Sequence, residues 1–170
     1  MCLHVKQVPA NFKLIKAEKN IVVYKQLSHY YHRYYTPYKE ICTPFQNKKI
    51  KFNFWGKCVL TSDLKGYYFV IPKTEKFFTK KFEMQWKDGS LLSPIPNIKD
   101  CHNVDLIIEE GIHAYKTKDG LTNQNFPELG YKWLIHKAII PKGSYYFIGT
   151  GNDIVADKMI IYRYHIRKRK

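Results

Sequence analysis

The residue types best suited to binding chemistry form one short run, Tyr30-Tyr31-His32-Arg33-Tyr34-Tyr35. Aromatic rings interleaved with cations can stack on nucleic-acid bases while the charges meet phosphates. The same side chains suit a protein–protein interface, where Tyr and Arg contribute much of the binding energy. We expect this run to bind a nucleic-acid or protein partner. The alternative is structural, with the amphipathic rings covering the core.

A second candidate is the run of four cations Arg167, Lys168, Arg169 and Lys170. Such a run attracts any polyanion without sequence preference, and salt weakens that attraction. It can equally act as a solubilising tail with no partner. We include these four residues among the expected partner-binding residues.

The charge of the whole chain points the same way. Its 170 residues contain 29 Lys and Arg but only 14 Asp and Glu, a net charge of +15. An excess of this size favours contact with a polyanion such as nucleic acid, a nucleoprotein particle or an acidic protein surface. The competing interpretation is compositional, because Lys outnumbers Arg and an AT-rich genome also enriches Lys, Asn, Ile, Tyr and Phe.

Motifs of catalysis and metal binding are missing from the sequence. Cys2, Cys42, Cys58 and Cys101 include no CxxC pair, the close spacing typical of zinc sites, so we expect free thiols. No HExxH, GxSxG, kinase-like or deaminase-like motif occurs. The sequence therefore predicts no cofactor and no metal and favours a protein that is not an enzyme. A Cys–His pair assembled in space stays an open alternative.

Short apolar and aromatic runs alternate with turn signals, which is typical of β-rich architecture. The predicted strands are Asn11–Lys16, Asn20–Gln26, Lys49–Trp55, Gly66–Ile71, Phe77–Trp86, Gly111–Tyr115, Lys132–Ile140, Ser144–Gly149 and Lys158–Ile166. The first two are expected to form a hairpin through Glu18-Lys19-Asn20, and the last three a meander. Gly149–Asp153 predicts a hairpin turn, because no helix follows it to make a phosphate loop.

Helix is expected to be scarce. Asn103–Glu110 predicts two helical turns, with Asn103 as N-cap and Gly111 as the stop. A second short helix is expected within Asp119–Leu129, and Asp88–Asp100 is expected to be a long loop. The predicted fold is α+β and mainly β, with antiparallel sheets, a C-terminal three-stranded meander and one or two short helices. We expect one domain over residues 1–170, with 167–170 as a basic tail.

Three segments carry a resemblance to a known group of proteins. GIHAY at Gly111–Tyr115, HKAIIPKGSYYFIG at His136–Gly149 and DIVADKMIIYR at Asp153–Arg163 resemble a group of uncharacterised phage and prophage proteins. Ile21–Lys25 and Tyr35–Tyr38 are similar to the opening of that group. The resemblance implies a phage-related context and a mixed fold with a central antiparallel sheet. Most of the shared residues look structural. His113, between Ile112 and Ala114, is the polar exception and a ligand candidate.

A more distant resemblance is to ADP-ribosyltransferase-like folds, which open with a strand carrying an aromatic–basic pair. Tyr24, Lys25 and His113 fit those parts and would surround a nicotinamide or nucleotide. No glutamate can be placed on a late strand, so NAD cleavage would lack its usual electrostatic support.

Together these features favour a non-enzymatic phage-type accessory protein that binds a polyanionic or nucleoprotein partner. The partner would be nucleic acid, virion proteins or a host defence complex that the protein inhibits. The alternatives are an ADP-ribosyltransferase-like enzyme or nucleotide-binding protein, and a structural virion subunit. With no apolar stretch typical of a signal peptide or a membrane span, we expect an intracellular location in the host cytoplasm, or the virion.

Overall fold

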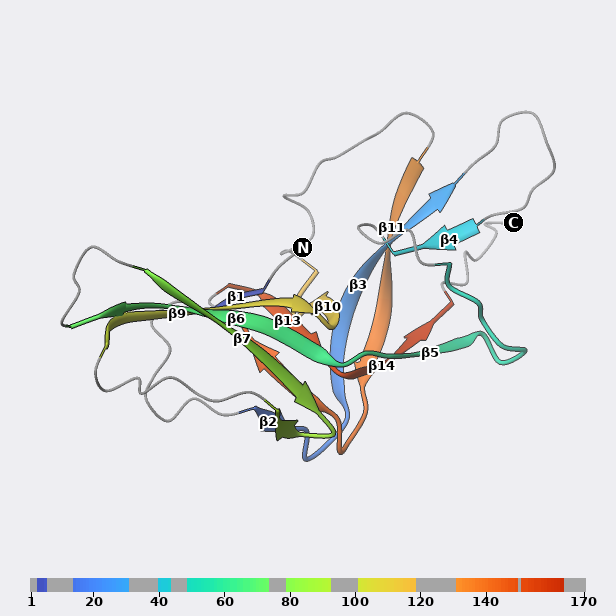
Figure 1. Ribbon diagram of the computed structural model, residues 1–170. Coiled ribbons are helices and arrows are strands. Elements are labelled where there is room, and N and C mark those ends of the chain that lie inside the picture. The colour runs from blue at the N-terminus through green and yellow to red at the C-terminus, as the bar shows by residue number, and fades with distance from the viewer. Residues whose placement is uncertain are drawn as a thin grey trace.

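The computed structural model describes residues 3–5, 14–30, 40–43, 49–73, 79–92, 101–118, 131–149 and 151–163. Within these ranges the chain forms fourteen strands and no helix, arranged as two antiparallel sheets (Figure 1). The protein is therefore mainly β, as the sequence predicts.

The smaller sheet has the strand order β1-β9-β6-β7-β8 and occupies the left half of Figure 1. Its strands are β1 (Leu3–Val5), β9 (Cys101–Glu110), β6 (Leu64–Pro72), β7 (Lys80–Lys87) and β8 (Ser90–Leu91). Asp88 and Gly89 join β7 to β8 as a two-residue hairpin, since Lys87 pairs with Ser90. The long loop expected over Asp88–Asp100 is therefore wrong at Ser90 and Leu91, which form β8.

The larger sheet has the order β2-β12-β13-β10-β3-β11-β14-β5, with β4 added beside β3. Its strands are β2 (Ile15–Lys16), β12 (Tyr145–Ile148), β13 (Asp153–Ala156), β10 (Ile112–Tyr115), β3 (Ile21–Tyr30), β11 (Tyr131–Ile140), β14 (Lys158–Tyr162), β5 (Lys57–Thr61) and β4 (Glu40–Cys42). The pairing of β3 with β11 is the longest and runs from Ile21 opposite Ile140 to Tyr30 opposite Tyr131. These two strands form the centre of the sheet.

Two clusters of buried apolar side chains stabilise the sheets. One covers a single face of the larger sheet and includes Val23, Leu27, Ala138, Ile140 and Met159. The other lies between the sheets and packs side chains of β12 and β13 against the smaller sheet; it includes Phe147, Val155, Tyr68, Leu106 and Trp86. The rings of Trp86 and Phe147 meet edge to face, with centroids 4.9 Å apart. This second cluster joins the two sheets.

Gly111 marks the point where the chain passes from one sheet to the other, between β9 and β10. Its φ of 140° is one that other residues rarely adopt. A β-carbon there would lie 2.5 Å from a methyl of Val155 and 2.7 Å from one of Leu64. The crossing therefore requires glycine for both its backbone angle and its space.

The predicted helix Asn103–Glu110 is wrong, because this segment is strand β9. Val104, Leu106 and Ile108 are buried, while Asp105 and Ile107 between them are partly exposed. That is the period of two of a strand, and pairing with β1 and β6 on either side satisfies the backbone. The other predicted helix, within Asp119–Leu129, falls where the structure is not described.

The predicted meander and the predicted hairpin are wrong in their pairing. β12 pairs with β13 and β2 rather than with β11, and β11 pairs with β14 and β3. Likewise β2 pairs with β12 and not with β3. The turn at Gly149–Asp153 is confirmed, since it joins β12 to β13 and Gly149 N donates to Asp153 O over 3.1 Å.

Gly66 allows β9 to approach β6 where their register shifts, and this gives a steric test. A β-carbon on Gly66 would lie 2.2 Å from the carbonyl oxygen of Ile107. We expect Gly66→Ala to lower the free energy of unfolding by about 3 kcal/mol, because backbone must move. Gly151→Ala is the matched control, since its β-carbon meets nothing closer than 3.9 Å. Thermal melts followed by circular dichroism measure both; equal melting temperatures would refute the close approach.

Candidate functional site

Most of the predicted partner-binding residues lie beyond the described ranges. Tyr31–Tyr35 and Arg167–Lys170 are among them, and their assignment stays a prediction. Tyr30 ends β3, where its backbone pairs with Tyr131 and Glu40.

Lys25 is buried inside the larger sheet, with only 7% of its surface exposed. It lies on β3 between Val23 and Leu27, and all three side chains face the apolar cluster. Its Nζ donates to the carbonyl oxygen of His113 over 2.6 Å. β10 pairs with β3 only at Tyr115 and Tyr24, so the ammonium bonds a carbonyl just beyond the end of that ladder. Burial lowers the pKa of Lys25 to about 8.

His113 lies on the opposite face of the sheet from Lys25, because its neighbours Ile112 and Ala114 occupy the apolar cluster. Burial, and then the charge of Lys25, lower the pKa of His113 to about 4. The ring is therefore neutral at physiological pH. Its Nε2 lies 3.4 Å from the carbonyl oxygen of Glu109, so this nitrogen carries the hydrogen.

The three ligand candidates therefore do not line one pocket. Tyr24 lies on the same face of the sheet as His113. The Nζ of Lys118 lies 5.6 Å from the centre of the Tyr24 ring. Lys25 faces the other way and its ammonium bonds main chain, so it does not present its charge to a ligand. Lys25 and His113 meet through one carbonyl group only.

His136 is a buried polar residue that the sequence does not distinguish from the other histidines. It lies opposite Lys25 on β11 and is fully buried. Its Nδ1 is 3.1 Å from the carbonyl oxygen of Tyr162, and its ring stacks on Phe52 at 6.3 Å and 23°. Burial lowers the pKa of His136, so this ring is also neutral.

Among the residues that the structure describes, the most exposed aromatic side chains are at the turn between Asn53 and Lys57, which precedes β5. Phe54 is 93% exposed and Trp55 is 77% exposed. Their rings meet edge to face at 5.4 Å and 83°. The sequence predicted a strand over Lys49–Trp55, so it gave no reason to expect these rings in solvent. An exposed Trp beside an exposed Phe is typical of a contact surface.

Two cations, Lys57 and Arg163, adjoin this turn. We use the term β5 surface for Phe54, Trp55, Lys57, Tyr162 and Arg163. The Nζ of Lys57 lies 5.7 Å from the ring centre of Tyr162, and Arg163 N donates to Gly56 O over 2.8 Å. Both cations are exposed. No Asp or Glu occurs between Glu40 and Asp63, so no acidic side chain of this segment opposes an anion. The β5 surface is therefore suited to polyanions.

A cleft of about 440 Å³ is acidic, in contrast to the basic β5 surface. Its lining includes three carboxylates, Asp63, Asp88 and Asp157, but only one cation, Lys158. Burial raises the pKa of Asp157, whose Oδ1 accepts from Tyr145 N over 2.9 Å. The cleft is acidic and is not suited to a polyanion.

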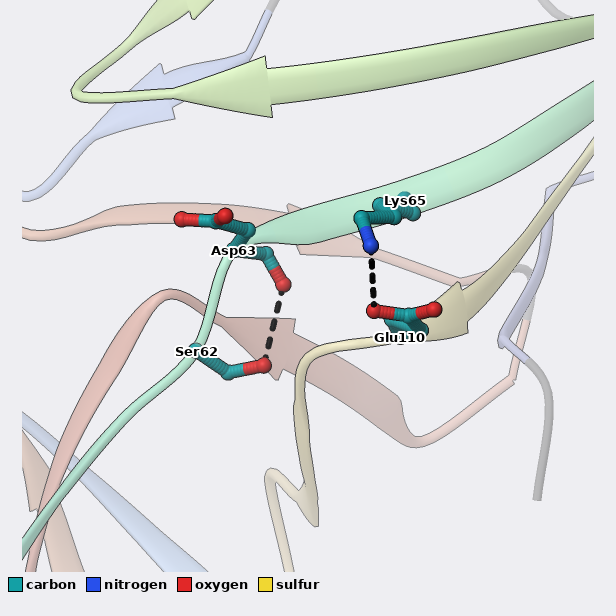
Figure 2. Close-up of polar contacts among 4 residues, drawn as sticks. All are labelled: Ser62, Asp63, Lys65 and Glu110. Atoms are coloured by element: carbon teal, nitrogen blue, oxygen red, sulfur yellow. Dashed lines mark hydrogen bonds and ion pairs between the residues drawn. The ribbon is translucent and has the colours of Figure 1, made fainter.

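Figure 2 shows the polar contacts of two residues that line this cleft, Ser62 and Asp63, beside the ion pair of Lys65 with Glu110. The Oγ of Ser62 donates to the carbonyl oxygen of Asp63 over 3.0 Å, and Lys65 pairs with Glu110 at 3.1 Å. The carboxylate of Asp63 points away from that ion pair. Lys65 thus neutralises Glu110 and leaves the charge of Asp63 at the cleft.

Two features are absent from the residues that the structure describes. No three His, Cys, Asp or Glu side chains among the described residues are placed to hold a metal ion. In the same part of the chain there is no helix that could cross a bilayer.

Comparison of the chain with protein-family models, curated proteins and solved structures finds no match. The resemblance to phage and prophage proteins therefore stays a prediction.

The buried ammonium of Lys25 predicts a dependence of stability on pH. Its pKa is about 8 in the folded chain and 10.5 ordinarily, so between these values the unfolded chain binds more protons. Stability conferred by residue 25 therefore rises with pH across that window. We expect wild type to gain about 3 kcal/mol over Lys25→Met between pH 8 and 10.5. Urea unfolding of both proteins across this range measures the difference, and a constant difference would refute the burial.

The two histidines are expected to be opposite neutral tautomers. A carbonyl only accepts, so His113 carries its hydrogen on Nε2 and His136 on Nδ1. Long-range ¹H–¹⁵N NMR spectra at pH 7 separate the two tautomers by the ¹⁵N shifts. His113 is expected to stay neutral down to about pH 5, because its pKa is about 4. Titration of His113 near pH 6.5 would contradict its partly buried position and the lowered pKa.

Proposed function

We propose that this protein is a non-enzymatic phage-type accessory protein that binds a polyanionic or nucleoprotein partner, with nucleic acid as the ligand that tests it. The observation that carries the proposal is the β5 surface, where exposed aromatic rings stand beside Lys57 and Arg163.

Electrostatics supports this assignment. A chain of +15 attracts a polyanion over a distance, and each phosphate that meets a cation releases counterions. On the β5 surface the cations are exposed and therefore free to move onto a phosphate. Such contacts give affinity without reading a base sequence.

The nucleotide-binding alternative has less support. Of its three residues, Lys25 is buried and bonds the carbonyl oxygen of His113, so it offers no charge to a pyrophosphate. The acidic cleft, which Asp63, Asp88 and Asp157 line, would repel the phosphates of a nucleotide.

Salt dependence tests the proposed function. We expect the protein to bind labelled DNA and RNA at low salt, with log K falling linearly against log salt. Lys57→Gln with Arg163→Gln removes two exposed cations, so it is expected to lower the affinity and reduce the slope by about 2. Fluorescence polarisation across a salt series measures both quantities.

A charge-matched control separates a site from net charge. Lys87→Gln with Lys142→Gln also removes two exposed cations, and both residues are absent from the β5 surface. We expect this control to change the affinity less than the Lys57 and Arg163 variant does. No binding to DNA, RNA or phage particles at low salt would refute the function, and equal effects of the two variants would refute the site.

A further inference from the structure

We infer that the Phe54–Trp55 turn stacks on unpaired bases, so that the ligand of this protein is single-stranded nucleic acid. This inference rests on the proposed function and names the ligand class of the same surface. It goes beyond charge, because the cations alone would hold single strands and duplexes alike.

Hydrogen bonds hold the backbone of the turn that carries the two rings. Gly56 N donates to Asn53 O and Asn53 N donates to Lys57 O, both over 2.9 Å. The side chain of Asn53 accepts from Lys57 N over 2.9 Å, and Arg163 N donates to Gly56 O over 2.8 Å. Four hydrogen bonds thus fix the turn before any ligand binds. Little backbone entropy remains to be lost on binding, which favours affinity.

The rings are exposed in the way that stacking requires. A base stacks on the flat face of an aromatic ring, and that face must be free of protein. Phe54 and Trp55 are 93% and 77% exposed, and their contact with each other is edge to face. An edge-to-face contact uses the face of only one ring of the pair. With so little of either side chain covered by protein, at least one broad ring face is open to a base.

Two exposed cations adjoin the turn and can meet the phosphates of a bound strand. Lys57 is one residue past Gly56 on the turn, and Arg163 is tied to Gly56 by its backbone. Proteins that bind single strands combine such a cationic track with aromatic platforms. In a duplex the base faces are covered by one another, so stacking on this turn would require unstacking first.

A lipid surface is the competing ligand for exposed aromatic rings beside cations. Interfacial helices that bind lipid present a broad apolar face. Here only two rings project, and the polar Asn53 and the charged Lys57 are immediately beside them. The turn is therefore better matched to a base than to a bilayer, and vesicles become an outcome of the test.

The experiment compares ligands of equal charge that differ in their bases. The full chain is titrated with single-stranded oligothymidylate, with an abasic single strand of the same length and with a duplex. We expect oligothymidylate to quench tryptophan fluorescence and to bind about 10-fold more tightly than the abasic strand. The chain has three tryptophans, of which Trp55 is exposed and Trp86 is buried. Because all three contribute to the fluorescence, a mutation of Trp55 is needed to assign the quenching to that residue.

Trp55→Ala is expected to weaken oligothymidylate binding about 10-fold, to remove most of the quenching and to leave abasic-strand affinity unchanged. Trp55→Phe keeps a ring and is expected to retain most of the affinity. Leu92→Ala is the control, since Leu92 is 60% exposed and is not part of the β5 surface. Thermal melts confirm that each variant is folded, which is expected because Trp55 packs on little else.

Three results would overturn the inference. Equal affinity for abasic strand and oligothymidylate would show that only phosphates are bound, and the proposed function would stand. A blue shift of Trp55 emission on phosphatidylserine vesicles, without quenching by oligothymidylate, would assign the turn to lipid. Absence of binding to every nucleic acid at low salt would remove the proposed function and this inference together.

Discussion

The fold depends on the burial of one short strand, β13, on both of its faces. Ile154 and Ala156 pack into the cluster of the larger sheet, while Val155 between them packs into the cluster that joins the two sheets. Alternate side chains of a strand point to opposite faces, so one strand contributes to two cores. Gly111 must be glycine because Val155 occupies the space beside it, and the chain crosses between sheets at that point. Displacing Val155 would therefore disturb both the crossing at Gly111 and the apolar cluster that joins the two sheets.

The buried lysine, the aspartates of the cleft and the cations of the β5 surface each lie where water or a polar protein group can solvate them. The one lysine buried among the described side chains, Lys25, is held by a carbonyl at the end of the β3–β10 ladder, which compensates part of its desolvation. Three aspartates gather at the cleft that Trp86 and Tyr145 also line. Exposed cations of the β5 surface remain free to exchange water for phosphate. The geometry thus separates an acidic cleft from a basic, aromatic turn on one positively charged chain.

Local pattern predicted several strands correctly, but it missed β5, β9 and β13, placed a strand over Lys49–Trp55 where the structure has a turn, and predicted the pairing of strands poorly. Gly66–Ile71 and Lys132–Ile140 lie within β6 and β11, because runs of apolar and aromatic residues between turn signals leave few other options. The segment Asn103–Glu110 was misread because Leu106, Ile107 and Ile108 are adjacent, which obscures the alternation that pairing with β1 and β6 imposes. The predicted meander is wrong because the chain turns at Pro141 between β11 and β12, and these two strands do not pair with each other.

The sequence by itself determined the β-rich composition, the turn at Gly149–Asp153 and the positive charge, since these follow from local propensity and from counting. It also marked His113 as a polar residue between apolar neighbours, and Lys25 only through the distant resemblance to ADP-ribosyltransferase-like folds. Only the tertiary structure decided that their side chains face opposite ways and that His136 is fully buried. It alone decided that Phe54 and Trp55 stand in solvent beside Lys57 and Arg163. Exposure and cross-strand pairing depend on residues distant in the chain, and no local pattern contains that information.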